Sequence, residues 1–183
     1  AHNVPNVPAP REIKWIWDDT FEHAFANDPD PMLPENVENR RFFLLCNHCT
    51  NPSCVRVCPA GATYKTADGL VAIDYHRCVG CRFCMAACPY GSRSFNFQDP
   101  RPFIRDLNPD YPTRMRGVVE KCTFCAERLE KGLMPACVEA SNGAIMFGDL
   151  NDPDSIVRRV LAKNFSIRRK PELGTDPGVY YII

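Results

Sequence analysis

The stretch Cys78-Val79-Gly80-Cys81-Arg82-Phe83-Cys84-Met85-Ala86-Ala87-Cys88-Pro89 decides how this chain folds. Its spacing, C-x2-C-x2-C-x3-C-P, is the ligand pattern of a bacterial-type [4Fe-4S] cluster. Three closely spaced thiolates can bind one cluster, whereas the fourth cysteine binds the other cluster in two-cluster ferredoxins. Zinc is the alternative, but structural zinc sites usually use two separated C-x2-C pairs. The spacing therefore favours an iron–sulfur cluster.

A second group has the closely related spacing C-x2-C-x4-C-x3-C-P, formed by Cys46, Cys49, Cys54 and Cys58. The turns Cys58-Pro59-Ala60-Gly61-Ala62 and Cys88-Pro89-Tyr90-Gly91-Ser92 repeat each other, as expected of an internally duplicated two-cluster unit. If the groups exchange their fourth ligands, one cluster is bound by Cys46, Cys49, Cys54 and Cys88. The other is then bound by Cys78, Cys81, Cys84 and Cys58.

A third group contains Cys122, Cys125 and Cys137 with the spacing C-x2-C-x11-C. Where the other groups continue into a C-P turn, this group has Ser141-Asn142-Gly143-Ala144, which is one residue shorter and lacks the thiol. The third group therefore offers three ligands of its own. Ser141 could bind iron as an alkoxide, but the shorter turn favours a capping role.

Composition limits the class of protein. The chain has 183 residues and a formal net charge of zero, so it has no strong field for nucleic acid or an anionic membrane surface. Its eleven cysteines fall in dense groups, which favours reduced metal ligands over a disulfide scaffold. No apolar run approaches the roughly 18 residues of a membrane span. Seventeen prolines and ten glycines predict a loop-rich fold that is ordered by its cofactors as much as by its core.

The sequence predicts an α+β fold with short strands and short helices. Alternating or apolar β-forming runs predict strands at residues 13–17, 40–45, 70–74, 144–147, 165–168 and 179–183. Good helix formers predict a helix at 126–131, and Asp152-Pro153 is typical of the cap and first residue of another. Residues 96–117 are loop-like, and we expect core packing from the C-terminal tail rather than a cofactor role.

Several polar residues lie beside the cysteine groups. His48 and His76 are placed to hydrogen-bond sulfur without being needed as ligands. Cations near a cluster favour its reduced, more negative form and raise its potential. For at least half of the six nearby cations we expect ordinary solvated surface charges instead. These six are Arg56, Arg77, Arg82, Arg93, Lys121 and Arg128.

The three groups, in this order, resemble the iron–sulfur subunits of respiratory membrane oxidoreductases, a ferredoxin-like family with four cysteine groups. Its members accompany dimethyl-sulfoxide, polysulfide, tetrathionate and nitrite reductases and related quinone-linked complexes. The resemblance spans residues 1–183 and includes the segments 148–153 and 173–177. Segments 108–114, 119–122 and 167–171 more narrowly resemble the periplasmic DsrO-type subunit of the membrane complex linked to dissimilatory sulfite reduction.

In this family the missing first group ends just before a segment similar to Ala1-His2-Asn3-Val4-Pro5, so the resemblance implies that the given sequence begins just past it. The outer groups exchange fourth ligands as the inner groups do. The resemblance thus implies two complete [4Fe-4S] clusters and a third site on Cys122, Cys125 and Cys137. That site is either [4Fe-4S] completed by an upstream residue, or [3Fe-4S]. His2 lies near the place of the missing ligand, although a loop histidine is the better interpretation.

The resemblance also implies a tandem of ferredoxin-like units. Residues 1–45 and 118–150 form an incomplete outer unit, 46–95 form the inner two-cluster unit, 96–117 form a surface connection, and 151–183 form a C-terminal helix and strands. We expect a non-catalytic subunit that relays single electrons between a redox partner subunit and the quinone or membrane module. Its partners would be a membrane anchor and a cytochrome or catalytic subunit, with no nucleic acid and no membrane span of its own.

Three other functions remain open at this point. A zinc-structured interaction module would lack the visible absorption of iron–sulfur clusters. A free-standing soluble ferredoxin would carry electrons between enzymes, but it would not need about 100 residues beyond its cluster groups. A catalytic enzyme would need an open iron position, which only the third site offers, and common cofactor motifs such as G-x-G-x-x-G and H-E-x-x-H are absent from the sequence. The resemblance to DsrO-type subunits implies a peripheral position on the periplasmic, or extracytoplasmic, side of the membrane.

Overall fold

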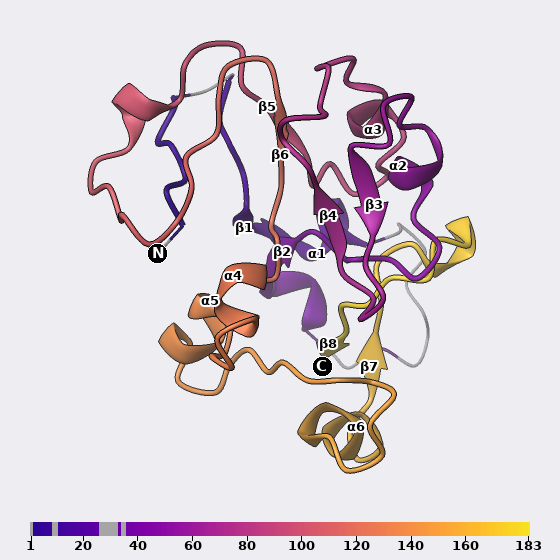
Figure 1. Cartoon of the computed structure of the whole chain (residues 1–183). Helices are drawn as coiled ribbons and strands as arrows, with labels where there is room; N and C mark the ends of the chain where they lie inside the picture. Colours follow the sequence, from indigo (N-terminus) through magenta and orange to yellow (C-terminus); the bar gives the residue numbers. More distant parts are fainter. Residues whose placement is uncertain (1, 9–10, 26–32, 34–35) are drawn as a thin grey trace.

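Four two-stranded antiparallel sheets, short helices and long loops make up the computed structural model, which describes residues 2–8, 11–25, 33 and 36–183 (Figure 1). The strands pair in sequence order, as β1 with β2, β3 with β4, β5 with β6 and β7 with β8. The fold is α+β, with short elements, as predicted. None of its helices, within the described residues, is long and apolar enough to cross a membrane.

The longest sheet pairs β1 (Ile16–Thr20) with β2 (Arg41–Leu45), so that Ile16 faces Leu45 and Thr20 faces Arg41. Two short helical turns, α1 (Phe21–Ala24) and η1 (Val37–Asn39), lie between the two strands in the sequence. Side chains alternate along β2, because Phe42 and Leu44 are buried while Phe43 faces solvent. The strand predicted at 40–45 is confirmed, and the one predicted at 13–17 begins three residues later.

The two inner cysteine groups fold alike. α2 (Ser53–Arg56) carries Cys54, and α3 (Phe83–Ala86) carries Cys84 at the equivalent place. The turn after each helix ends at the last cysteine of the group, whose backbone N–H donates to a carbonyl three residues earlier. Cys58 donates to Val55 O and Cys88 donates to Met85 O, both at 3.2 Å. The duplication in the sequence is therefore a duplication in structure.

Each inner turn leads into a strand. The first leads to β3 (Thr63–Lys65), which pairs with β4 (Val71–Ile73), and the second leads to β5 (Ser94–Phe95), which pairs with β6 (Val119–Glu120). The strand predicted at 70–74 is confirmed by β4. Residues 96–117 form a long loop with one 3-10 turn, η2 (Arg101–Phe103), as expected.

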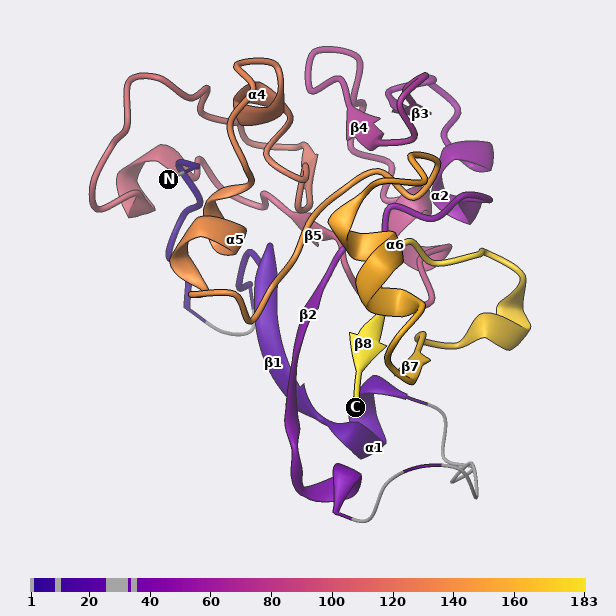
Figure 2. The ribbon, with the colours of Figure 1, turned by 90° about the horizontal axis from the view of Figure 1, so that it is seen from below.

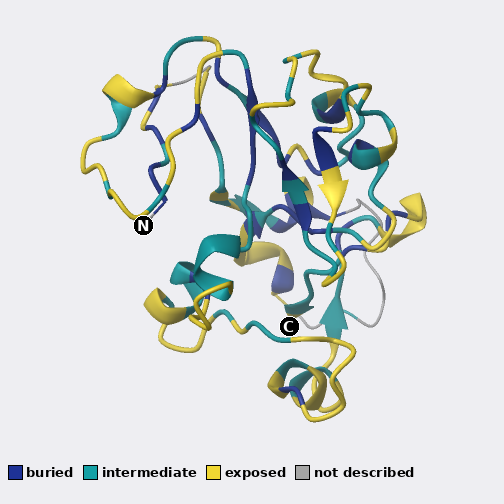
Figure 3. Ribbon diagram, viewed as in Figure 1, coloured by how far each residue is buried: buried dark blue, intermediate teal, exposed yellow. Residues whose placement is uncertain are grey.

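The C-terminal third contains the remaining elements, which are α4 (Ala126–Leu129), α5 (Ala136–Ala140), α6 (Ile156–Leu161), β7 (Ser166–Ile167), η3 (Pro171–Leu173) and β8 (Tyr181–Ile182). The strand predicted at 144–147 was wrong, because the Ile145 N–H bonds the Ser141 side chain at 3.0 Å rather than a neighbouring strand. The last helix begins after Ser155 rather than at Asp152-Pro153. Helix α6 is largely open to solvent (Figure 3).

Two separate hydrophobic clusters stabilise the fold. One is aromatic and joins β1, α1 and β2 to the C-terminal strand, with Tyr181 packing edge-on against Phe25 and Phe42 at centroid distances of 5.1 and 5.8 Å. The other lies between the inner cysteine groups and consists of Cys54, Val71, Ile73, Cys84 and Val119. Two of the cysteines are thus part of the protein's own core.

The N-terminal segment runs beside the long loop (Figures 1 and 2). The Asn3 side chain donates to Asn108 O at 2.9 Å and to Tyr111 O at 2.7 Å, and it accepts the Asn108 N–H at 2.8 Å. These bonds tie the N-terminal segment to a loop that is more than 100 positions away in the sequence.

Candidate metal centres

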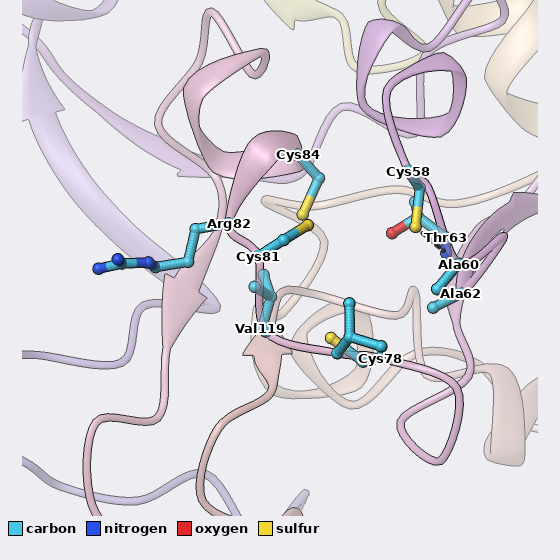
Figure 4. Close-up of a pocket in the computed structure, with 11 residues that line it drawn as sticks. Cys58, Ala60, Ala62, Thr63, Cys78, Cys81, Arg82, Cys84 and Val119 are labelled. Carbon is cyan, nitrogen blue, oxygen red and sulfur yellow. Dashed lines mark hydrogen bonds between the residues drawn. The ribbon is translucent and has the colours of Figure 1, made fainter.

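One cavity is lined by four of the predicted ligands. Cys58 comes from the turn after α2, Cys78 and Cys81 from the loop before α3, and Cys84 from α3 itself (Figure 4). The empty space between them, including its opening to solvent, is about 290 Å³. We call these four cysteines the second inner site. They are the set that crosswise exchange of the fourth ligand predicts.

The shape of this cavity fits a cluster better than a single ion. In the described part of the chain, no three His, Cys, Asp or Glu side chains are arranged to hold one metal ion. The four sulfurs instead surround a shared space, as ligands of a larger cofactor must (Figure 4). Burial raises the pKa of Cys58, but backbone hydrogen bonds from Thr63, Ala62 and Ala60 outweigh burial and lower the pKa overall. These backbone donors therefore favour the thiolate form of Cys58, which is the form that binds metal.

The loop of the second inner site needs glycine at position 80. Gly80 has a φ of +70°, and a Cβ added there would lie 2.3 Å from the carbonyl oxygen of Gly117. Only glycine lets the loop backbone approach residue 117 so closely. This contact holds Cys78 and Cys81 at the wall of the cavity, where Cys81 is exposed.

The other predicted set also comes together, and we call it the first inner site. Burial raises the pKa of Cys49 to about 11, against a hydrogen bond from Thr175. Charges on Cys46, Cys54 and Cys88 raise this pKa further, so all three thiols lie close enough to Cys49 to act on its charge. The structure thus brings together Cys46, Cys49, Cys54 and Cys88, as crosswise exchange predicts.

The third group stands next to the first inner site. Burial raises the pKa of Cys122 to about 12, and the charge of Cys46 raises it further. Backbone N–H groups donate to two of its sulfurs at 3.4 Å, from Phe124 to Cys122 and from Ala136 to Cys125. Burial raises the pKa of Cys125, and the hydrogen bond from Ala136 lowers it. The charge of Cys137 raises it again, so the pKa of Cys125 is raised overall. We call Cys122, Cys125 and Cys137 the third site.

The two non-cysteine candidates at the third site have other contacts. Ser141 Oγ donates to Val138 O at 2.9 Å and accepts the Ile145 N–H at 3.0 Å, so it caps the turn as expected. His2 is buried against the rings of Trp15 and Tyr111, with Nδ1 3.9 Å from Glu127 Oε2. These contacts suit the interpretation of His2 as a packed loop histidine.

His48 links the first inner group to the third. Its Nδ1 accepts the Val71 N–H at 3.0 Å, so Nε2 carries the proton and donates to Cys122 O at 3.0 Å. Phe124 stacks on the ring at a centroid distance of 3.7 Å. Burial, reinforced by the Lys121 charge, holds the His48 pKa far below its ordinary value. The expectation that His48 bonds sulfur was wrong, because its ring nitrogens bond backbone groups.

The six nearby cations divide as expected. Arg56, Arg77 and Arg82 are exposed, and the Arg128 side chain is 15% exposed in a pair with Glu139. Arg93 and Lys121 are buried instead. Lys121 donates to Cys122 O at 2.7 Å, and Arg93 donates to Cys54 Sγ at 3.0 Å.

The C-terminal tail does more than pack the core. Residues 174–178 lie along the first cysteine loop, where the backbone N–H groups of Thr50 and Asn51 donate to the carbonyls of residues 176 and 175 at 2.8 and 3.0 Å. Thr175 is buried and also bonds the Tyr90 hydroxyl. The expectation that the tail only packs the core is therefore corrected at Thr175, whose side chain also hydrogen-bonds Cys49.

A buried ion pair, which was not foreseen, ties the long loop to the third group. Arg114 Nη2 lies 3.0 Å from Glu120 Oε2, and both side chains are nearly inaccessible to solvent. Glu120 also accepts hydrogen bonds from Asn96 at 2.6 Å and Trp15 at 3.0 Å. The sequence held one clue to this site, because Glu120 directly follows the apolar residues Val118 and Val119 and precedes Lys121-Cys122.

The chain matches the family described as a 4Fe-4S dicluster domain over residues 39–100 and 107–150. It is 49% identical over 148 residues to the Hdr-like menaquinol oxidoreductase iron-sulfur subunit 1 of Archaeoglobus fulgidus, covering 75% of this chain and 55% of that protein. It is 42% identical over 160 residues to the menaquinone reductase iron-sulfur cluster-binding subunit of Nitratidesulfovibrio vulgaris, covering 75% and 63%. A third relative, the arsenate respiratory reductase iron-sulfur subunit ArrB of a Shewanella strain, is 40% identical over 170 residues, covering 75% and 73%. The chain spans about half the length of the first of these relatives.

Proposed function

Because this chain belongs to the 4Fe-4S dicluster domain family, we propose that it is the electron-transfer subunit of a membrane-associated respiratory oxidoreductase. Its relatives include iron–sulfur subunits of a menaquinol oxidoreductase and of a menaquinone reductase, which favours this function over that of a free ferredoxin. Its redox partners would be a catalytic or cytochrome subunit and a quinone-linked membrane module.

The proposed cofactors are two complete [4Fe-4S] clusters and a third cluster. The first inner site, the second inner site and the third site supply their cysteine ligands. When bound, such clusters supply one-electron transfer. The protein supplies thiolates, backbone N–H donors to sulfur, and apolar walls such as Val119 that exclude water.

The observation that carries this proposal is the adjacency of the three sites. Arg93 contacts Cys54 of the first inner site and also lowers the pKa of Cys84 of the second, which burial raises. Burial raises the pKa of Cys122 in the third site, and the charge of Cys46 in the first inner site raises it further. The first inner site is therefore adjacent to each of the other two, which is the kind of connection that a relay needs.

The finer predictions from the resemblance belong to the same proposal. They are a tandem of ferredoxin-like units with the domain bounds given above, the absence of a catalytic site, and a periplasmic, peripheral position in a DsrO-type complex. The pairing of β5 with β6 joins the inner unit to residues 118–150, which supports a close association of the two units.

Two measurements test this function. Anaerobically prepared protein should contain about twelve iron atoms per chain if the third cluster is [4Fe-4S], or about eleven with a [3Fe-4S] signal after oxidation. In mild detergent it should co-purify with membrane redox proteins. A colourless, iron-free sample would contradict the cofactor assignment. A stable, fully loaded monomer that has no membrane partner would instead favour the soluble ferredoxin.

A further inference from the structure

Two positions related by the internal duplication meet in the core. Thr63 follows Cys58 by the same interval at which Arg93 follows Cys88, so the two residues are equivalent in the repeated turns. Both are buried, with exposed fractions of 3% and 5%. Arg93 Nη1 lies 3.3 Å from Thr63 Oγ1 and donates to it. At these equivalent positions, the second repeat thus carries the cation Arg93, and the first repeat carries Thr63, whose hydroxyl oxygen accepts a hydrogen bond from it.

The same guanidinium contacts the first inner site and lies near the second. Its Nη2 donates to Cys54 Sγ of the first inner site at 3.0 Å. Burial raises the pKa of Cys84 in the second inner site, and the charge and a hydrogen bond of Arg93 oppose that rise. Cys54 and Cys84 belong to one buried cluster. Arg93 therefore lies between one proposed ligand of each inner cluster.

The charge of Arg93 is balanced by sulfur. Among the described residues, no carboxylate lies within ion-pair distance of its guanidinium. Burial disfavours the charged form, but Cys54, Cys84 and Cys46 favour it and leave the Arg93 pKa above its ordinary value. A buried cation requires a counter-charge nearby, and here the thiolates of two sites provide it together.

We propose that Arg93 is a positioning residue shared by the two inner clusters, and that its single buried charge raises the reduction potential of both. Reduction adds one negative charge to a cluster, and a cation beside a ligand sulfur of each cluster favours that charge on either one. Thr63 leaves room for one cation at the centre of the duplication and orients it. This inference rests on the proposed ligand sets.

The test compares Arg93→Gln, Arg93→Lys and the swap Thr63→Arg with Arg93→Thr. The matched control is Arg82→Gln, which removes an exposed cation that lines the second inner site and stacks on Phe95. Each protein is loaded anaerobically and titrated with redox mediators, with the EPR signal of each cluster followed separately.

Arg93→Gln should lower the one-electron reduction constant of both inner clusters about tenfold, which is about 59 mV for each. Arg93→Lys and the swap keep a cation at the centre, so they should stay closer to the unmodified chain. Arg82→Gln should shift the second inner cluster by a factor of about two or less, because water and salt screen an exposed charge.

Three results would overturn the inference. They are unchanged potentials in Arg93→Gln, a shift confined to one inner cluster, and equal shifts in Arg93→Gln and Arg93→Lys. If Arg93→Gln fails to hold its clusters, loaded lysine and swap variants would support a requirement for the charge, whereas their failure would reduce Arg93 to a packing residue. An unmodified chain without inner clusters would contradict the proposed function instead.

Discussion

At the scale of single residues, the buried polar side chains around the third group decide how firmly it is held. His48 uses both ring nitrogens to join Val71 of β4 to Cys122, and Glu120 binds Arg114 in a site closed to solvent. A buried polar group that loses its partner costs more than the bond itself contributes. Substitutions at these positions should therefore weaken the fold without removing a proposed ligand.

For His48 we expect His48→Asn to lower the free energy of unfolding by about 2–4 kcal/mol, because the buried Val71 N–H loses its acceptor and Cys122 O loses one of its two donors. Asparagine accepts the φ of +41° found at this position, so backbone strain does not add to the loss. The thermal unfolding midpoint, measured anaerobically, should fall by about 5–12 °C. The control His76→Asn changes an exposed ring and should stay within about 0.5 kcal/mol. Equal midpoints for both variants would refute the bridging role.

For the buried ion pair we expect Glu120→Gln to cost about 3–5 kcal/mol, because the Arg114 charge would stay buried without its counter-charge. The exposed pair Asp99–Arg101, which has a closer N–O distance of 2.7 Å, provides the control. Asp99→Asn should leave the midpoint unchanged, since surface ion pairs contribute little. A larger effect at Asp99 than at Glu120, measured by anaerobic thermal unfolding, would show that burial is not what matters.

At the scale of elements, the cysteine loops depend on backbone approach rather than on regular structure. The helices that carry Cys54 and Cys84 are one turn long, and the strands beside them have two or three residues. Such elements are not stable in isolation. The loop of residues 78–81 instead packs directly on the backbone at residue 117.

Gly80→Ala tests this packing. Gly69 is the control, because it also has a positive φ, of +91°, but an added Cβ would meet no atom within 4 Å. Both variants carry about 1–2 kcal/mol of backbone strain. Gly80→Ala adds a clash with Gly117 O, so we expect a larger fall in midpoint and a selective loss of iron from the second inner site. Equal iron contents in the two variants would show that the loop tolerates displacement.

At the scale of the whole molecule, the spacing of the cysteines predicted more than the propensities did. The patterns at 46–58 and 78–89 predicted which four thiols would come together in each inner site, because a fixed ligand spacing constrains the chain directly. Strands at 40–45 and 70–74 were also predicted, since alternation and β-branched residues are local signals.

Other features depend on contacts between distant segments and left little trace in the sequence. Thr175 reaches Cys49, and His48 reaches Cys122, across 126 and 74 positions. Residues 144–147 have the composition of a strand, but the Ile145 N–H donates locally to Ser141 Oγ instead of to a neighbouring strand. Similarly, Arg93 was one of six cations near the cysteines, and only tertiary structure separates it from the exposed ones.

The most direct test of the account compares the cluster spectra of Cys58→Ser, Cys81→Ser and Cys49→Ser. If fourth ligands are exchanged between the inner groups, Cys58→Ser alters the EPR signal that Cys81→Ser alters and leaves unchanged the signal that Cys49→Ser alters. The exchange of fourth ligands would be contradicted if Cys58→Ser and Cys49→Ser altered the same EPR signal while Cys81→Ser altered a different one.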